Sequence, residues 1–266
     1  MGTQSPRSVT RAKRMAEPAD RDASTVSGWT GAIARPSGES AVVVEFGDRI
    51  DPALQSRVAA LTAALDAAPP PGAREIVPTY RSVLIAFDPR ETTPQGVLRA
   101  LPVEADRETG QSAARAWHVP VCLDDAVAED LDALADVLDL TPANVRRRLL
   151  AHPVRVGMYG FVPGAAYLTG LDPRLATPRR TTPRAPVPAG SLIVAAGQAV
   201  LLPVSMPTGW YLVGRTAARM FDPSAAERGA PPVPFAVGDE LRFEAVSETA
   251  LQSLERDPRG GVRPIA

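Results

Sequence analysis

Three arginines carry the clearest chemical signal in this sequence of 266 residues. Arg179 and Arg184 each follow a proline, and proline restricts both its own backbone and that of the preceding residue. Arg215 stands on a short apolar strand. A guanidinium group held in a fixed position binds a carboxylate or a phosphate through two parallel hydrogen bonds. The three arginines therefore predict a shared anion site, with surface ion pairing or a structural role as the alternative for each of them.

Glycines and a few polar or aromatic residues accompany these arginines. The loop from Gly160 to Gly164 has backbone amides that an anion could approach, although a tight turn between strands would need the same glycines. Gln198 could offer its amide to a ligand or fix a corner of the fold, and Trp210 could line a pocket or belong to the core. The full set of predicted substrate- or phosphate-binding residues is Arg179, Arg184, Arg215, Gln198, Gly160, Phe161, Pro163, Gly164, Gly209 and Trp210.

The scarcity of other reactive side chains excludes several mechanisms. Lys13 is the only lysine, so no lysine of a folded domain can form a Schiff base, and there is no Gly-Lys-Ser/Thr phosphate loop. One cysteine, Cys122, and two histidines, His118 and His152, are too few for an internal disulfide or a zinc site. Ser205 has no histidine at the spacing of a nucleophilic triad. We predict no metal site, and the sequence identifies no catalytic residue.

The composition is that of a globular protein. Hydrophobic residues make up 45% of the chain, and the net charge of −1 argues against wholesale binding of nucleic acid. No apolar run approaches the ~20 residues of a membrane span, and the N-terminus lacks the apolar segment of a signal peptide. We expect a cytoplasmic protein that binds neither nucleic acid nor a membrane.

The length predicts two domains, because single cores rarely grow beyond ~250 residues. Residues 41–46 are rich in the β-branched residues that favour strands, and residues 76–78 and 82–87 are expected to form paired strands. Asp51 and Thr93, each followed by proline, are typical helix N-caps. Their order predicts a ferredoxin-like β-α-β-β-α layer. In the second half, proline and glycine separate short apolar runs, which is typical of a β-barrel or sandwich. The expected divisions are a disordered tail (1–28), a ferredoxin-like α/β domain (29–101), a linker (102–116), a β-barrel domain (117–246) and a C-terminal tail (247–266).

Short motifs follow one another in a fixed order along the chain. They are Val77 to Ser82, Phe87-Asp88-Pro89, Gly160 to Gly164 with Tyr167-Leu168, Pro178-Arg179, Pro183-Arg184, Val187 to Ser191, Gly197-Gln198, Gly209-Trp210, Gly214-Arg215-Thr216 and Phe221-Asp222. This series resembles the B subunit of the bacterial 5-oxoprolinase (PxpB), a family also called KipI or allophanate hydrolase subunit 1. The likeness is collinear over roughly residues 38–245.

The resemblance implies an α+β fold in which a ferredoxin-like domain precedes a cyclophilin-like β-barrel. It implies two partners, the C subunit with a related barrel and the A subunit, with which the chain would open 5-oxo-L-proline to L-glutamate while ATP is hydrolysed. Two other functions stay open. One is a half-site of a biotin-dependent carboxyltransferase similar to urea carboxylase, and the other is a non-catalytic inhibitor of a histidine kinase.

The sequence departs from the family pattern at several pocket positions. The departures are Ala165 in place of Phe, Ala199 in place of Thr, Leu202 in place of Tyr, Met206-Pro207-Thr208 in place of Ser-Pro-Gly, and Leu149 and Val154 in place of a His and a Tyr. The glycines that shape the backbone and the arginines are retained. The resemblance therefore implies the fold more directly than it implies the substrate.

Overall fold

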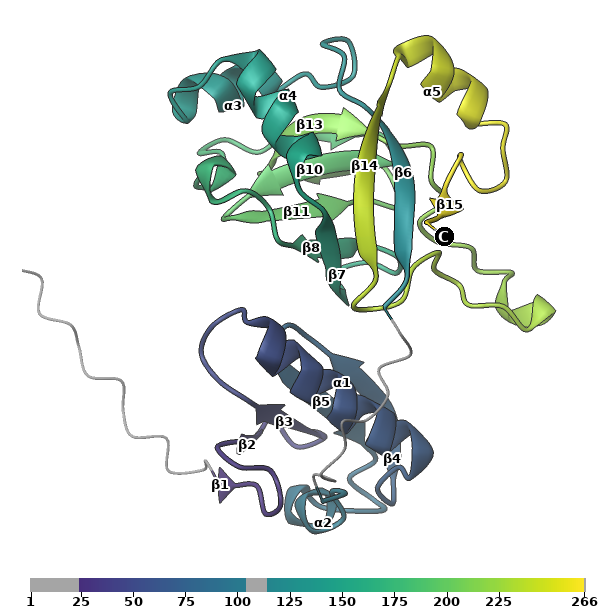
Figure 1. Ribbon diagram of the computed structural model, residues 1–266. Helices are drawn as coiled ribbons and strands as arrows, with labels where there is room; N and C mark the ends of the chain where they lie inside the picture. Colours follow the sequence, from purple (N-terminus) through teal and green to yellow (C-terminus); the bar gives the residue numbers. More distant parts are fainter. Residues whose placement is uncertain (1–23, 104–113, 266) are drawn as a thin grey trace, which may run out of the picture.

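The structure is a computed structural model that describes residues 24–103 and 114–265. It contains two separate main sheets, one in the N-terminal part of the chain and one in the C-terminal part (Figure 1). Most of the expected linker, 102–116, and most of the expected N-terminal tail lie outside the described residues. None of the helices in the described ranges is both long enough and apolar enough to cross a bilayer.

The N-terminal sheet has five antiparallel strands in the order β1-β2-β3-β5-β4. The strands are β1 (Ser24–Thr25), β2 (Ile33–Pro36), β3 (Ala41–Glu45), β4 (Ala73–Pro78) and β5 (Ser82–Phe87). Helix α1 (Pro52–Ala67) contacts β4 and β5, and helix α2 (Pro94–Arg99) contacts β3. The predicted β-α-β-β-α order is confirmed from β3 to α2. Strand β2 adds a further strand beside β3.

Helix α1 begins where the sequence predicts it. The side chain of Asp51 accepts a hydrogen bond from the backbone N–H of Ala53, and a proline occupies the first helical position, where no N–H is needed. The helix buries Val58, Leu61 and Leu65. These side chains join alternate residues of β3 and β5 in one apolar cluster, which is the core of the N-terminal domain.

The C-terminal sheet closes on itself as a β-barrel in the order β13-β10-β11-β8-β7-β14-β6. Its strands are β6 (Ala116–Cys122), β7 (Val154–Tyr159), β8 (Ala166–Thr169), β10 (Ser191–Ala195), β11 (Gln198–Leu201), β13 (Tyr211–Arg215) and β14 (Glu240–Val246). The barrel closes where Arg215 of β13 pairs with Cys122 of β6. Strands β6 and β14 pair in parallel along their whole length. The α+β class and the barrel predicted from the sequence are confirmed.

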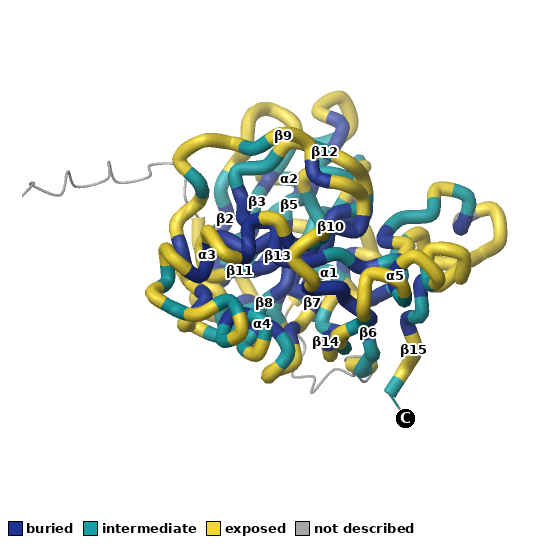
Figure 2. Tube along the Cα trace, turned by 90° about the horizontal axis from the view of Figure 1, so that it is seen from above, coloured by how far each residue is buried: buried dark blue, intermediate teal, exposed yellow. Residues whose placement is uncertain are grey.

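Side chains of the barrel strands alternate between two apolar clusters. Leu192 and Val194 of β10 belong to the interior cluster, while Ile193 and Ala195 belong to a second cluster outside the wall. The buried strands lie at the centre of the molecule in Figure 2. Helices α3 (Leu131–Val137) and α4 (Pro142–Ala151) contribute to the interior cluster. Strands β9 (Arg184–Val187) and β12 (Met206–Thr208) pair as a separate small sheet.

Both expected tails contain folded segments, which corrects the boundaries drawn from the sequence. Strand β1 pairs with β2, and Val26 is buried in the N-terminal core, so the first domain begins before residue 29. After residue 246 the chain forms helix α5 (Glu248–Leu254) and strand β15 (Arg263–Pro264), which pairs with β6. Leu251 and Val262 are buried. Burial of these few apolar side chains orders segments whose overall composition is polar.

Candidate functional site

A cavity of about 550 Å³ lies beside the end of β13. Gly190, Arg215, Thr216 and Phe221 form part of its lining, and each belongs to one of the sequence motifs. Another part of the lining, residues 255–258, follows helix α5. The cavity therefore joins residues of the sequence motifs with a segment that was expected to be a C-terminal tail.

Backbone contacts and one ion pair hold Arg215 in this cavity. Its Nε donates a hydrogen bond to the carbonyl oxygen of Ala189 at 3.0 Å, and its Nη2 lies 2.7 Å from Oε1 of Glu255. The backbone N–H of Thr216 donates to the carbonyl oxygen of Gly190 at 2.9 Å. Gly190 has φ +80°, and a Cβ there would lie 2.1 Å from the oxygen of Thr216. Glycine is therefore required for the turn and the strand to come this close.

The loop from Gly160 to Gly164 is fastened to the wall of the same cavity. Gly164 has φ +83°, and a Cβ on it would lie 2.6 Å from Cβ of Phe221 and 2.7 Å from the carbonyl oxygen of Met220. Phe221 and Met220 both line the cavity. The side chain of Phe161 points away from this packing, because 79% of its surface is exposed. Of this loop, Gly164 thus shapes the wall, while Phe161 and the exposed Pro163 face outward.

Arg184 lies elsewhere, in a buried polar network. Its Nη1 is 2.6 Å from Asp130, and Arg180 also reaches this carboxylate at 2.8 Å. Asp130 accepts a further hydrogen bond from the backbone N–H of Leu212 at 2.8 Å, and it is only 7% exposed. Arg184 is also paired with Glu129. The network fastens the segment from Pro178 to Arg184 to the beginning of helix α3 and to the first part of β13.

Arg179 ends a row of aromatic rings that links the two domains. Its guanidinium carbon lies 5.8 Å from the ring centroid of Trp210, which lies 6.2 Å from that of Tyr167. Tyr167 in turn lies 6.5 Å from Tyr80, which belongs to the N-terminal domain. The ring pairs meet edge to face, the arrangement that the aromatic quadrupole favours. Burial raises the pKa of Tyr167, and the charge of Arg179 opposes this rise.

Gln198 and Gly209 are placed by backbone contacts. Gln198 begins β11 and pairs with Ala195. Since side chains alternate along a strand, Gln198 lies on the same face of β11 as Val200. Val200 belongs to the outer cluster, which also contains Trp210. The carbonyl oxygen of Gly209 accepts a hydrogen bond from the N–H of Arg180 at 2.8 Å. Neither residue is among those that line the 550 Å³ cavity.

The predicted site residues thus fall into three groups, and the expectation of one shared arginine site is wrong. Arg215 lies in the cavity, Arg184 binds Asp130, and Arg179 stacks on Trp210. Leu212, which contacts Asp130, and Arg215 stand near opposite ends of the short strand β13, so the first two groups are separated by most of its length. The binding role of each residue stays a prediction.

Sequence reasoning missed Gly157, which lies where the two domains touch. A Cβ on this residue would stand 2.3 Å from Cε1 of Tyr80 and 3.0 Å from Nε2 of Gln55. The pairing of β7 with β8 shifts register between Val156 and Met158. A glycine inside an apolar strand is the sequence signal of such a bulge or close approach. In the described part of the chain, the hydroxyl of Tyr80 and the Nε2 of Gln55 are buried without a hydrogen-bond partner.

Two further features bear on possible chemistry, the free cysteine and the arrangement of potential metal ligands. Cys122 is buried and unpaired, and burial raises the pKa of its thiol. The described residues contain no group of three or more His, Cys, Asp and Glu side chains that could hold a metal ion.

Comparisons with known proteins agree with this architecture. Residues 32–231 match the family described as carboxyltransferase domain, subdomain C and D. The chain belongs to this family. It is 31% identical over 235 residues to the B subunit of 5-oxoprolinase from Bacillus subtilis (strain 168), a match that covers 83% of this chain and 95% of that protein. The name of that relative makes it one part of a larger assembly.

Two solved structures show how the fold is used in longer chains. The protein TTHA0988 is 31% identical, with a TM-score of 0.66 over 79% of this chain. The chain spans only 40% of that protein. The urea carboxylase of Kluyveromyces lactis shares the fold at 21% identity, with a TM-score of 0.71 over 88% of this chain and 24% of its own.

Proposed function

We propose that the chain is the B subunit of an ATP-dependent 5-oxoprolinase, which acts together with the C and A subunits of the same complex. The observation that carries this proposal is the match to the Bacillus subtilis protein, since 31% identity extends over 95% of that relative. A match of this extent includes both sheets as well as the motif residues around the cavity. The retained motifs favour the same function as the overall likeness does.

The reaction is the hydrolysis of a cyclic amide. In 5-oxo-L-proline the bond between the carbonyl carbon and the ring nitrogen breaks. Water supplies a hydroxyl group to the carbon and a proton to the nitrogen, so that L-glutamate forms. Hydrolysis of ATP to ADP and phosphate would drive the opening. Both the substrate and the co-substrate are anions, which a site built on arginine can bind.

The cavity beside β13 suits such anions. Arg215 is held by the carbonyl oxygen of Ala189, so its guanidinium group has a defined direction before a ligand arrives. Arg219 and Arg256 also line the cavity. These three residues would hold the carboxylate of the lactam or the phosphates of ATP. Glu255 is already paired with Arg215, so a bound carboxylate would share or replace that partner.

A reconstitution experiment tests the proposal. The purified chain is mixed with its two partner subunits, and glutamate release from 5-oxoproline is measured with and without ATP. We expect release that depends on all three proteins and on ATP. The variant Arg215→Ala loses charge-assisted hydrogen bonds worth about 1.5–3 kcal/mol, so the ratio kcat/KM should fall roughly 10- to 100-fold.

The matched control is Arg242→Ala, which removes a surface arginine paired with Glu240 and outside the cavity. It should leave turnover unchanged, and both variants should melt like the parent protein. Complete assembly without any activity on lactams, amides or urea would contradict the proposed function. Unchanged turnover in Arg215→Ala would remove this residue from the binding site.

The family description favours one other candidate, a carboxyltransferase half-site. In that case the substrate would receive a carboxyl group from carboxybiotin, and a biotin-carrier domain would be encoded in the partner protein or beside it. Incorporation of labelled bicarbonate into an acid-stable product, abolished by avidin, would favour this function. Activity that is insensitive to avidin would exclude it.

A further inference from the structure

We propose that Phe161 is a docking anchor, inserted into an apolar pocket of the C subunit of the complex, which is expected to have a related barrel and is called the second barrel protein below. Phe161 has the largest exposed fraction, 79%, among the exposed large hydrophobic side chains in the described part of the chain. A few anchor side chains carry most of the binding energy of protein interfaces, and aromatic residues, Phe among them, are enriched there. This inference rests on the proposed function only in that a second barrel protein exists.

The backbone holds Phe161 in a strained turn. The N–H of Val162 donates a hydrogen bond to the carbonyl oxygen of Gly160 at 2.8 Å, and the residue between them, Phe161, has φ +69°. A hydrogen bond of this span around a residue with positive φ defines a γ-turn of the rare, strained kind. Phenylalanine is poorly suited to this conformation, in which glycine is the usual residue.

Within residues 24–103 and 114–265, no packing compensates this strain. A ring that is mostly exposed gains little from burial, so the conformational cost of the turn is not returned by local packing. Strained residues that persist on a surface are concentrated at sites of binding or catalysis. We therefore infer that the benefit of presenting this ring comes from a contact outside the described chain.

The sequence around the turn identifies the chemistry of the partner. Residues 156–171 contain no charged side chain, and Met158, Val162 and Pro163 keep part of their surface exposed. Depletion of charge together with exposed aromatic and Met side chains is typical of the core of a protein interface. A nucleic acid or an anionic membrane surface would require basic residues here. The expected partner surface is therefore an uncharged pocket that accepts one aromatic ring.

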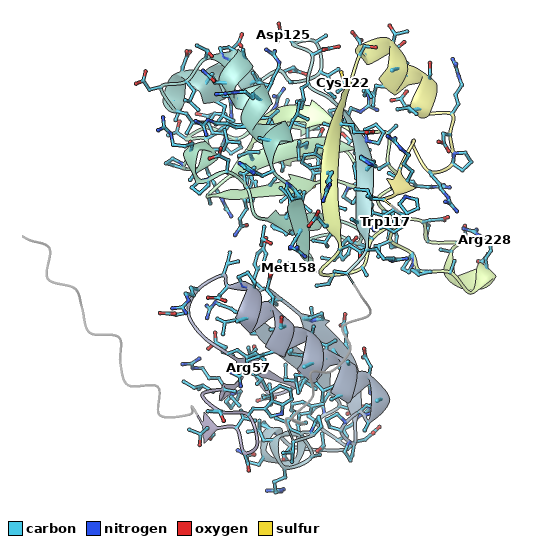
Figure 3. The ribbon with its side chains drawn as sticks, viewed as in Figure 1. Arg57, Trp117, Cys122, Asp125, Met158 and Arg228 are labelled. Carbon is cyan, nitrogen blue, oxygen red and sulfur yellow. The ribbon has the colours of Figure 1, made fainter. Side chains whose placement is uncertain are left out.

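The turn lies next to the candidate site. Gly164, three residues after Phe161, packs on Phe221, which lines the 550 Å³ cavity. A protein bound at Phe161 would thus lie beside the candidate site. Met158, on the strand that leads into the turn, is labelled in Figure 3 at the end of the barrel that faces helix α1 of the N-terminal domain. In TTHA0988 the region similar to this chain is joined to further sequence that makes up the rest of the protein.

Binding of the second barrel protein to three variants tests the proposal. Titration calorimetry and light scattering measure the affinity and the size of the complex for Phe161→Ala, Phe161→Gly and the control Val137→Ala. Val137 is 56% exposed at the end of helix α3 and is unstrained. We expect both Phe161 variants to raise Kd at least ten-fold and the control to leave it unchanged.

Phe161→Gly also tests the strain directly. Glycine adopts positive φ without steric cost, so this variant should melt at a higher temperature than the parent protein although it binds more weakly. A variant that melts lower than the parent would show that Phe161 stabilises the fold, which contradicts the proposal. Unchanged affinity of both Phe161 variants would also contradict it.

The remaining outcomes separate this proposal from the proposed function. A higher KM for the lactam with unchanged assembly would make Phe161 a substrate-binding residue and overturn the docking role. The chain alone could form a dimer that dissociates in Phe161→Ala. That result would show that Phe161 docks on a second copy of this chain, and it would overturn the proposed docking on the second barrel protein. A wild-type chain that does not bind the second barrel protein at all would also overturn it. Normal assembly without ATP-dependent turnover would contradict only the proposed function.

Discussion

Gly157 lies against Tyr80 so closely that a methyl group on its Cα would stand 2.3 Å from the ring carbon Cε1. This contact brings the barrel and the N-terminal domain together, since Gly157 belongs to β7 and Tyr80 follows β4. Tyr80 continues the contact through Tyr167 to Trp210 and Arg179. The packing of the two domains thus depends on the absence of a side chain at one position of a barrel strand.

The variant Gly157→Ala should weaken this packing. The added methyl group must displace a buried ring, and overpacking of this kind costs about 1–3 kcal/mol. Urea denaturation should show a lower midpoint, reported by the fluorescence of Trp29 in the N-terminal domain and of Trp117 and Trp210 in the barrel. Gly209→Ala is the matched control, because a Cβ at Gly209 would meet no atom within 4 Å. If Gly157→Ala unfolds at the same urea midpoint as Gly209→Ala and the parent protein, the contact between Gly157 and Tyr80 contributes nothing to the free energy of unfolding.

Asp130 should be one of the most sensitive positions for stability. Asp130→Asn leaves the partly buried guanidinium groups of Arg180 and Arg184 without their shared charge. Breaking a buried pair costs about 3–5 kcal/mol, and the partial exposure of Arg180 reduces this to about 2–4 kcal/mol. Asp136→Asn, on the exposed side of the same helix, should change the free energy of unfolding by less than about 0.5 kcal/mol. A similar loss in both variants would argue against a structural role for the network.

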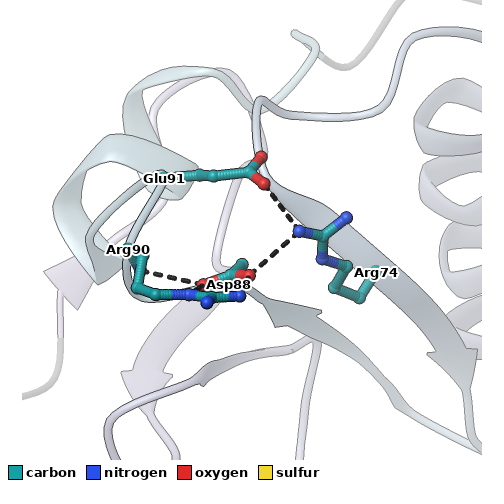
Figure 4. A network of polar contacts seen from close by, with 4 residues as sticks. All are labelled: Arg74, Asp88, Arg90 and Glu91. Carbon is teal, nitrogen blue, oxygen red and sulfur yellow. Dashed lines mark hydrogen bonds and ion pairs between the residues drawn. The ribbon is translucent and has the colours of Figure 1, made fainter.

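The stability of the N-terminal domain should fall in acid because of Asp88. Hydrogen bonds from the side chain and backbone of Arg90, and from the side chain of Arg74, hold the pKa of Asp88 well below its usual range (Figure 4). Because the pKa of Asp88 is lower in the folded protein than in the unfolded chain, its ionised form stabilises the fold. This stabilisation is fully present at pH values above the pKa of the unfolded chain, which is near 4, and it is lost as the pH falls toward the lower pKa of the folded protein.

Unfolding curves between pH 5 and pH 2 measure this effect. Asp88→Asn should be less stable than the parent at neutral pH and should lose less stability on acidification, because it lacks the group that titrates. Hydrogen exchange of the β5 amides assigns the change to the N-terminal sheet. Parallel pH profiles for the two proteins would show that other carboxylates govern the acid response.

Glu255 should compete with anionic ligands for Arg215. The pair is partly exposed, so its loss is worth about 0–1 kcal/mol, or up to roughly five-fold in affinity. In the reconstituted enzyme, Glu255→Gln should lower the KM for the lactam or for ATP by a factor within that range. Glu248→Gln, at the beginning of helix α5, which ends directly before Glu255, provides the control. A higher KM in Glu255→Gln would show that the carboxylate positions Arg215 for binding.

The sequence predicted those helices, strands and turns whose structure depends only on residues close together in the chain. Asp51 with Pro52 and Thr93 with Pro94 mark the beginnings of α1 and α2, because a cap and the first turn need only neighbouring residues. The β-branched run at 41–46 forms strand β3 over Ala41–Glu45. The Gly and Pro spacing of the second half indicated barrel turns such as the one at Gly190.

Features that depend on distant contacts could not be predicted in this way. Nothing near Arg184 in the sequence shows that Asp130, far earlier in the chain, neutralises it. Strand β15 has only two residues and exists because the edge of β6 is available to it. The cavity likewise needs Glu255 and its neighbours, whose local sequence reads as an ordinary polar segment.

The parallel pairing of β6 with β14 has a consequence for folding of the nascent chain during synthesis. During synthesis β6 leaves the ribosome long before β14 and β15, yet these two strands supply most of its neighbours. Pairing across such a sequence distance is slow. The strands of the N-terminal sheet are all complete by Phe87, so this sheet can form first. Val119 and Val121 of β6 stay exposed until β14 and β15 have been synthesised. We expect ribosome-bound chains that end before residue 240 to recruit chaperones through this strand.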